Sequence, residues 1–199
     1  MQTVHGFNAP GATTESAPED ATRLDQVVES LALVADVCRS DQLVYVEQGG
    51  WPVAVHHFAP RPVPSLYPGP QVGQRLDRRA LSPVYRVLER PGERQTVNGA
   101  FIWGSPTFQE ASPIRRADGR IIGVLSSNGN LHEHERFQRQ DPLFRSAVEW
   151  VRDQALDGRL QGAEKLGRLT EHDGVMIVDQ HGVILFLNSV AEHQYRRVG

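Results

Sequence analysis

Apolar residues recur with a helical period near the start of the chain. From Leu24 to Cys38 they stand three or four positions apart, which predicts an amphipathic helix with one buried stripe. Thr22, with Asp25 three residues later, is placed to cap this helix. Residues 1–20 mix Ala, Pro, Gly, Ser, Thr and Glu without any period, so we expect a disordered lead there. Cys38 lies on the stripe and is interpreted as a small buried hydrophobe rather than a reactive thiol.

Period-two alternation then appears in two places. Residues 43–48 and 51–58 are rich in β-formers and are joined by Gly49-Gly50, and residues 107–127 contain Asp118-Gly119 between apolar runs. Gly-Gly and Asp-Gly pairs are typical of two-residue hairpin turns. The sequence therefore predicts two β-hairpins.

A connection and a short helix separate these hairpins. Residues 59–73 hold five of the 13 prolines, a content that excludes a helix or a central strand. Residues 80–90 predict a short helix, with Ser82 as its cap, Pro83 in its first turn and Pro91-Gly92 beyond its end.

Helical patterns return after the second hairpin. Asp141-Pro142 opens a helix that ends near Gly158, and the apolar spacing of residues 159–170 predicts a connector helix. Residues 174–188 predict a strand, a turn and a strand, followed by the start of another helix. Two strands and a helical turn cannot bury a core alone, so we expect residues 171–199 to be the beginning of a truncated second domain.

This order of elements is typical of an α+β fold, in which helices group against an antiparallel sheet. Together with the hairpin PIRRADGRIIGVL (113–125) before the closing helix, it resembles a GAF domain. The segment DGVMIVDQHGVILFLN (173–188) resembles the opening of a PAS domain. The Ala35-Asp36 pair, Asp41 and Leu43 within residues 31–46 resemble the N-terminal sensor region of soluble histidine kinases that contain GAF and PAS domains.

The resemblance implies a division of the chain and a role for it. Residues 21–158 would be a GAF-like sensor domain, residues 159–170 a connector helix and residues 171–199 the start of a PAS-like domain. In this family a phosphoacceptor helix pair and an ATP-binding domain follow, and the usual output is a response regulator. The chain would then be a non-enzymatic, cytoplasmic sensor module that forms a homodimer and controls a kinase core outside it.

Composition restricts the partners. A net charge of −3 gives no electrostatic case for nucleic acid. No stretch approaches the ~20 apolar residues that a membrane span needs, and the N-terminus lacks the basic start and apolar run of a secretion signal. We therefore expect neither nucleic-acid nor membrane binding, and a cytoplasmic location.

Two histidine-containing motifs invite specific interpretations. His132-Glu133-His134-Glu135 could be a phosphoacceptor box or a metal pair, but it lacks the long dimerisation helix of the first and the third ligand of the second. We prefer a solvated, charged start of the closing helices, and no metal site. On the second strand, His56 and His57 face opposite ways. One of them would meet the helix side and the other the ligand side or solvent. A core or rim histidine is the preferred role of each, with a haem or metal ligand as the alternative.

The candidate ligand pocket is drawn from the segment NGAFIWGSPTF (98–108) and its surroundings. Trp103 and Phe108 would line an apolar cavity, with Tyr85 and Glu110 as polar anchors and His57 nearby. Core packing is the alternative for each of them. The arginines of residues 75–94 are interleaved with acids and predict a solvated mixed face, with phosphate binding as the alternative.

No catalytic constellation is evident in the sequence, which has no P-loop, GxSxG, HExxH, CxxC or ATP lid. Two alternatives to the sensor remain: an enzyme that acts on a small molecule in the same pocket, and a dimerisation domain without a ligand. The cofactor is unknown, because no residue pattern specifies one.

Overall fold

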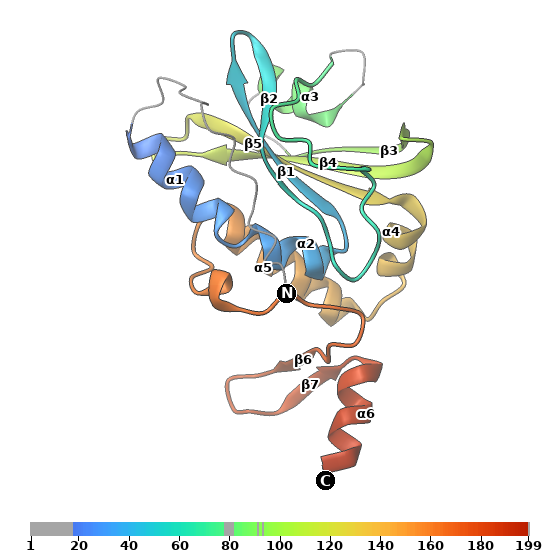
Figure 1. Ribbon diagram of the computed structural model, residues 1–199. Helices are drawn as coiled ribbons and strands as arrows, with labels where there is room; N and C mark the ends of the chain where they lie inside the picture. The colour runs from blue at the N-terminus through green and yellow to red at the C-terminus, as the bar shows by residue number, and fades with distance from the viewer. Residues whose placement is uncertain (1–17, 78–81, 91, 93, 199) are drawn as a thin grey trace.

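The computed structural model describes residues 18–77, 82–90, 92 and 94–198. In this part of the chain a five-stranded antiparallel sheet has the order β2-β1-β5-β4-β3 (Figure 1). Its strands are β1 (Asp41–Gln48), β2 (Trp51–Phe58), β3 (Gln95–Ile102), β4 (Ser105–Arg115) and β5 (Ile121–Asn130). Helices flank the sheet, so the α+β prediction is confirmed.

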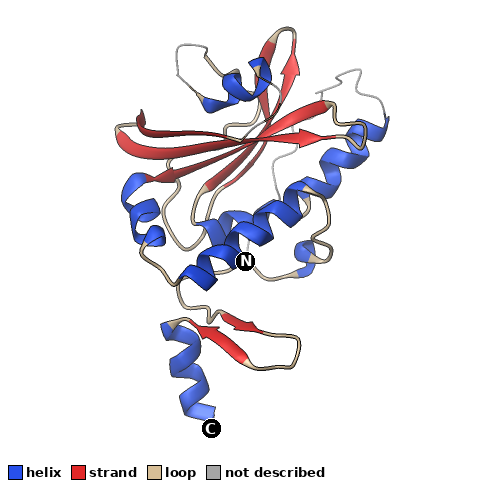
Figure 2. Cartoon of the chain, turned by 180° about the vertical axis from the view of Figure 1, so that it is seen from behind, coloured by secondary structure: helices blue, strands red, loops and turns tan. Residues whose placement is uncertain are grey.

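Both faces of the sheet are covered (Figures 1 and 2). One face packs against the long helices through a core that includes Leu31, Val44 and Leu125. The other face packs against a short helix through Leu43 and Val84. The helices on the first face are α1 (Pro18–Val28), α2 (Leu31–Cys38) and α5 (Pro142–Leu156), the short helix is α3 (Pro83–Glu89), and α4 (Leu131–Gln138) follows β5 directly. We call these faces the helix side and the loop side.

Local turn chemistry explains the elements that the sequence predicted correctly. Gly49 and Gly50 both have positive φ in the β1–β2 turn, and Gly119 has a φ of 87° between β4 and β5. The Ser82 hydroxyl accepts a hydrogen bond from the backbone N–H of Val84, which caps α3. Both predicted hairpins and the short helix are confirmed.

The single helix predicted over Leu24–Cys38 is wrong, because the structure has two helices there. α1 ends at Val28 and α2 begins at Leu31, and between them the Ser30 hydroxyl donates to the Val27 carbonyl. A serine hydroxyl that bonds the carbonyl three residues earlier competes with continuation of a helix. Thr22 lies inside α1 and donates to the Pro18 carbonyl, so it is not the cap.

The predicted disordered lead of residues 1–20 is wrong at its end, since α1 already begins at Pro18. Residues 1–17 lie outside the described residues.

Strand β3 was not predicted from the sequence. Its pairing with β4 shifts between Asn98 and Ala100, and Gly99 in between has a φ of 78°. This bulge interrupts the alternation of side chains on which a strand prediction depends. β3 is therefore a strand because β4 pairs with it.

The connector helix predicted for residues 159–170 is wrong. The segment contains one 3₁₀ turn, Ala163–Lys165, preceded by Gly162 in the left-handed region and followed by Leu166 in extended conformation. Leu160 packs against the helix-side core and Ala163 is buried, whereas Leu166 is 59% exposed. The apolar residues of this segment thus pack an irregular stretch of chain against the sensor domain. We call residues 159–170 the linker.

A small unit follows the linker, below the long helices in Figure 1. It consists of the antiparallel strands β6 (Met176–Val178) and β7 (Ile184–Leu187) and the helix α6 (Ser189–Val198). The Asn188 side-chain oxygen accepts hydrogen bonds from the N–H groups of Val175 and Ala191, which ties hairpin and helix together. Phe186 of β7 stacks on Phe144 of α5 with ring centroids 5.1 Å apart. This unit has the strand–turn–strand–helix order that the sequence predicted.

Candidate functional site

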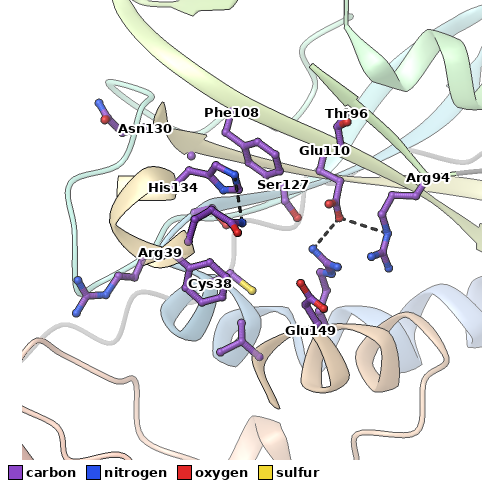
Figure 3. Close-up of a pocket in the computed structure, with 16 residues that line it drawn as sticks. Cys38, Arg39, Arg94, Thr96, Phe108, Glu110, Ser127, Asn130, His134 and Glu149 are labelled. Carbon is purple, nitrogen blue, oxygen red and sulfur yellow. Dashed lines mark hydrogen bonds and ion pairs between the residues drawn. The ribbon is translucent and has the colours of Figure 1, made fainter. Parts of the chain in front are cut away.

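A cavity of about 320 Å³ lies on the helix side, between the sheet and helices α2, α4 and α5 (Figure 3). Strands β3, β4 and β5 form its roof. Its lining combines apolar side chains with a charged cluster: Cys38, Arg94, Thr96, Phe108, Glu110, Ser127, His134, Phe137, Val148, Glu149 and Arg152. A cavity in which apolar side chains and convergent polar groups meet is typical of small-molecule sites.

Glu110 is the acidic centre of this cavity. Its carboxylate forms ion pairs with Arg152 of α5, at 2.7 Å, and with Arg94 just before β3, at 3.4 Å (Figure 3). The Glu110 and Arg152 side chains are 9% and 12% exposed. Arg94 also bonds Asp153 of α5. A carboxylate is stable at such depth only with cationic partners, so this cluster connects the sheet to α5.

Phe108 and His134 form the aromatic wall. Their rings are stacked, with centroids 3.7 Å apart and planes 4° from parallel. Asn130 caps α4 by accepting from the N–H of His132, which starts the helix that carries His134. Desolvation by burial lowers the pKa of His134, and the nearby Glu135 opposes this effect in part. The imidazole on Phe108 is therefore neutral near pH 7.

Cys38 closes the cavity from α2. Burial raises the pKa of its thiol to about 11. Of the two weaker effects, the charge of Arg152 lowers this pKa and that of Glu110 raises it. A thiol with so little thiolate is not a nucleophile at neutral pH. This supports its interpretation as an apolar wall residue.

The structure brings together only part of the predicted ligand set. Phe108 and Glu110 face the same helix-side cavity. Trp103 lies in the β3–β4 turn, with a φ of 48° and 72% exposure, so its assignment to the pocket lining is wrong. His57 and Tyr85 lie on the loop side: His57 Nε2 is 3.0 Å from Asp41 Oδ1, and the Tyr85 hydroxyl donates to the Leu76 carbonyl. Alternation along β2 puts His57 on the loop side, and Tyr85 belongs to α3, which packs on that side, so neither can meet Phe108.

A second cavity, of about 210 Å³, lies on the loop side. It is lined by polar side chains from the strands and from the 59–76 connection: Tyr45, Tyr67, Gln71, Gln74, Arg75, Gln109, Ser126 and Asn128. The Asn128 amide donates to the Tyr67 hydroxyl, and burial raises the pKa of Tyr45 to about 12. His57 borders this cavity through edge-to-face contact with Tyr67.

Sequence reasoning missed Arg94 and Arg152 as partners of Glu110, and the polar lining of the loop-side cavity. For the second there was a signal. Gln109 stands two positions from Ala111, and Ser126 and Asn128 continue the alternation of Val124, so all three share the face of these apolar residues and point into the protein. Buried polar positions of this kind indicate a pocket or a hydrogen-bond network.

The His132–Glu135 segment is α4, and its two histidines differ. The His132 side chain is 76% exposed and lies beside Glu135, as expected of a solvated start, whereas His134 is stacked on Phe108. The interpretation of the whole segment as solvated is therefore wrong for His134. Among the described residues, no three His, Cys, Asp or Glu side chains gather in a way that could hold a metal ion.

A sheet of this order, flanked by terminal helices on one face and by a short helix and loops on the other, defines an α+β sensor domain of the GAF type. The family comparison is more specific. The chain belongs to the family described as "Histidine kinase PdtaS, GAF domain", whose sequence model matches residues 11–147.

The comparison with solved structures found the following similarities. The sensor region of a sensor histidine kinase superposes with a TM-score of 0.63 at 21% identity, covering 92% of this chain and 65% of that one. The chain thus spans about two thirds of that sensor region's length. An IclR homolog from Microbacterium hydrocarbonoxydans complexed with 4-hydroxybenzoate gives a TM-score of 0.48 at 12% identity, covering 74% of this chain and 71% of that one. Pseudomonas aeruginosa HmgR gives 0.47 at 18% identity, covering 70% and 68%.

None of the curated proteins matches this chain. Within the described ranges, no helix is both long and apolar enough to cross a membrane.

Proposed function

We propose that this chain is the signal-sensing module of a cytoplasmic two-component histidine kinase, and that it controls autophosphorylation of a kinase core elsewhere in the parent protein. The observation that carries this proposal is the Glu110 cluster. Glu110 stands on the sheet, and Arg152 stands on α5, the helix that leads into the linker. A small molecule that enters the helix-side cavity contacts both.

The mechanism is a shift between two positions of α5. A ligand that fits the cavity better in one position stabilises that position by its difference in affinity. The Phe144–Phe186 stack passes the movement of α5 to the C-terminal unit. The kinase core then responds to the position of that unit.

Blocking the cavity tests the proposal. Thr96 lines the mouth and is exposed on the edge strand β3, so Thr96→Trp fills the entrance without entering the core. Asn98, two positions along the same strand, is exposed and outside the lining, and Asn98→Trp is the matched control. We expect a compound from a panel of nucleotides, haem and common metabolites to raise the melting temperature of the wild type and of the control, but not of Thr96→Trp.

The same compound should change the autophosphorylation rate of the full-length kinase, and Thr96→Trp should abolish the change. A compound that stabilises both variants equally places the binding site elsewhere. A compound that binds in the cavity and leaves autophosphorylation unaltered contradicts the sensing function.

The C-terminal unit is proposed to be the start of a PAS domain. Support comes from its strand–turn–strand–helix order and from Asn188, which bonds both Val175 and Ala191. We further propose that the module works as a homodimer and that its parent kinase signals to a response regulator, as the resemblance implies. The enzyme alternative has no comparable support: the Cys38 thiol is protonated, and Glu110 is held by two arginines.

A further inference from the structure

Asp36 is a junction between segments that are far apart in sequence. Its carboxylate is fully buried near the end of α2. Oδ1 accepts a hydrogen bond of 2.9 Å from the backbone N–H of Arg61, in the 59–76 connection. Oδ2 accepts one of 3.0 Å from the backbone N–H of Leu169, in the linker. One side chain therefore holds both segments.

Arg168 completes the junction from the linker. Its Nε donates to Asp36 Oδ2 and its Nη2 to Asp36 Oδ1, each at 2.7 Å, in a two-pronged ion pair. Nη2 also donates to the Ala59 carbonyl at 2.6 Å. Paired charge-assisted bonds of this geometry are among the strongest that side chains make. The linker is thus fixed to the sensor domain at the place where the connection leaves β2.

The connection can transmit a displacement. It contains Pro60, Pro62, Pro64, Pro68 and Pro70, and such a proline content stiffens a segment that has no regular structure. Its far part lines the loop-side cavity with Tyr67, Gln71, Gln74 and Arg75. Its middle is held by Asp41, which accepts from the Ser65 hydroxyl at 2.6 Å and the Leu66 N–H at 2.9 Å. The proline-rich connection thus joins the cavity lining to Arg61 and Ala59, with Asp41 as a fixed point between them.

We propose that Asp36 and Arg168 form a releasable latch that couples the 59–76 connection to the linker. Displacement of the connection changes the positions of the Arg61 N–H and the Ala59 carbonyl, and the linker is bound more or less firmly as a result. Release of the linker frees the C-terminal unit from this anchor. The effect of release on the kinase rests on the proposed function, whereas the latch itself is a property of this chain.

Hydrogen exchange at the Leu169 amide measures the latch directly, because that amide donates to Asp36. We expect Arg168→Ala to speed its exchange by at least about tenfold, since the charge-assisted bonds that hold the linker are lost. Lys165→Ala is the control: its side chain is 82% exposed in the same linker, and exchange at Leu169 should not change. Unchanged exchange in Arg168→Ala, with the fold intact by circular dichroism, overturns the latch.

A second pair of variants tests the coupling. Arg61 reaches Asp36 through its backbone N–H, so Arg61→Ala keeps the bond and Arg61→Pro removes it. We expect Arg61→Pro to speed exchange at Leu169 several-fold and Arg61→Ala to leave it as in the wild type. If Ser65→Ala and Arg61→Pro both leave Leu169 protected, the connection and the linker are not coupled.

The full-length kinase separates this proposal from the proposed function. If the latch regulates the kinase, Arg168→Ala shifts the autophosphorylation rate and Lys165→Ala does not. An active kinase whose rate ignores Arg168→Ala, while exchange at Leu169 rises, contradicts the regulatory consequence alone. A parent protein without autophosphorylation contradicts the proposed function and leaves the exchange results standing.

Discussion

Glu110 and its two arginine partners show how burial determines what an ion pair contributes to the free energy of unfolding. Arg152 is 12% exposed and meets the carboxylate at 2.7 Å, whereas Arg94 is 37% exposed and meets it at 3.4 Å. Removing one partner of a buried pair leaves a charge without compensation, and an exposed partner is replaced by water. The two arginines therefore differ in what they contribute to stability.

We predict that Arg152→Ala lowers the free energy of unfolding by about 3 kcal/mol, a typical cost of breaking a buried pair. Arg94→Ala should cost no more than about 1 kcal/mol, as for pairs open to solvent. Urea denaturation of both variants measures the difference. Equal losses would mean that the exposed arginine contributes as much to stability as the buried one.

His134 should make stability depend on pH in a specific window. Desolvation lowers its pKa below the ordinary value of 6.5, so the unfolded chain takes up a proton at a pH where the folded protein does not. The free energy of unfolding therefore falls as the pH drops below about 6.5, until the folded-state pKa is passed. His134→Phe keeps a ring on Phe108 and removes the proton.

We predict that the wild type loses more stability than His134→Phe between pH 7 and pH 5. Burial lowers the pKa of His56 as well, but that residue is present in both proteins and cancels in the comparison. Parallel pH profiles for the two proteins would show that His134 titrates alike in the folded and unfolded chains.

Elements whose ends are set by local chemistry were predictable from the sequence. Ser82-Pro83 marked the start of α3, Asp141-Pro142 the start of α5, and Gly-Gly and Asp-Gly the hairpin turns. Elements that depend on distant partners were not. β3 exists by pairing with β4, and residues 159–170 form a linker because Leu160 packs against the helix-side core and Arg168 binds Asp36.

The site follows the same division. Alternation along β4 put Phe108 and Glu110 on one face, and the structure keeps them together in the helix-side cavity. Trp103 was misplaced because an aromatic residue beside a glycine belongs as readily to a turn as to a pocket. Arg94 and Arg152 could not be paired with Glu110 from the sequence, since their meeting requires the packing of α5 on the sheet.

At the level of elements, we predict that Asp141→Ala destabilises α5. The Asp141 carboxylate accepts from the Leu143 N–H at 2.8 Å, and losing such a cap costs about 1 kcal/mol. Asp141→Ser retains a capping oxygen and should recover most of the loss. Chemical denaturation gives both values, and an equal loss in the two variants would show that the cap is not the cause.

For the whole molecule, the exposed face of α5 is the contact that we propose for the homodimer. Leu143 and Trp150 stand seven positions apart, on one side of the helix, and are 40% and 58% exposed. Exposed apolar side chains on one helix face are typical of helix–helix interfaces. Leu160 of the linker packs within the chain and is not available for such a contact.

We predict that Trp150→Glu weakens the proposed homodimer by at least about tenfold in dissociation constant, since truncation of an aromatic hot spot at an interface costs about 2 kcal/mol or more. Leu166→Glu is the control, because Leu166 is 59% exposed and belongs to the linker, not to α5. Sedimentation velocity over a concentration series reports both. Loss of the dimer in Leu166→Glu alone would place the interface at the linker.

The order of strands also governs when the domain can fold. β1 lies between β2 and β5, and the β5 residues that pair with it, Val124 to Asn128, follow it by about eighty residues in the sequence. During synthesis on a ribosome, the β1–β2 hairpin therefore has an unpaired edge on β1 until β5 has emerged. Pairing between strands so far apart in sequence can only follow synthesis of both. An unpaired edge of this kind is open to other chains. A pause in synthesis before residue 121 should for this reason promote aggregation. A pause after residue 160 should not, because β5 can by then pair with β1.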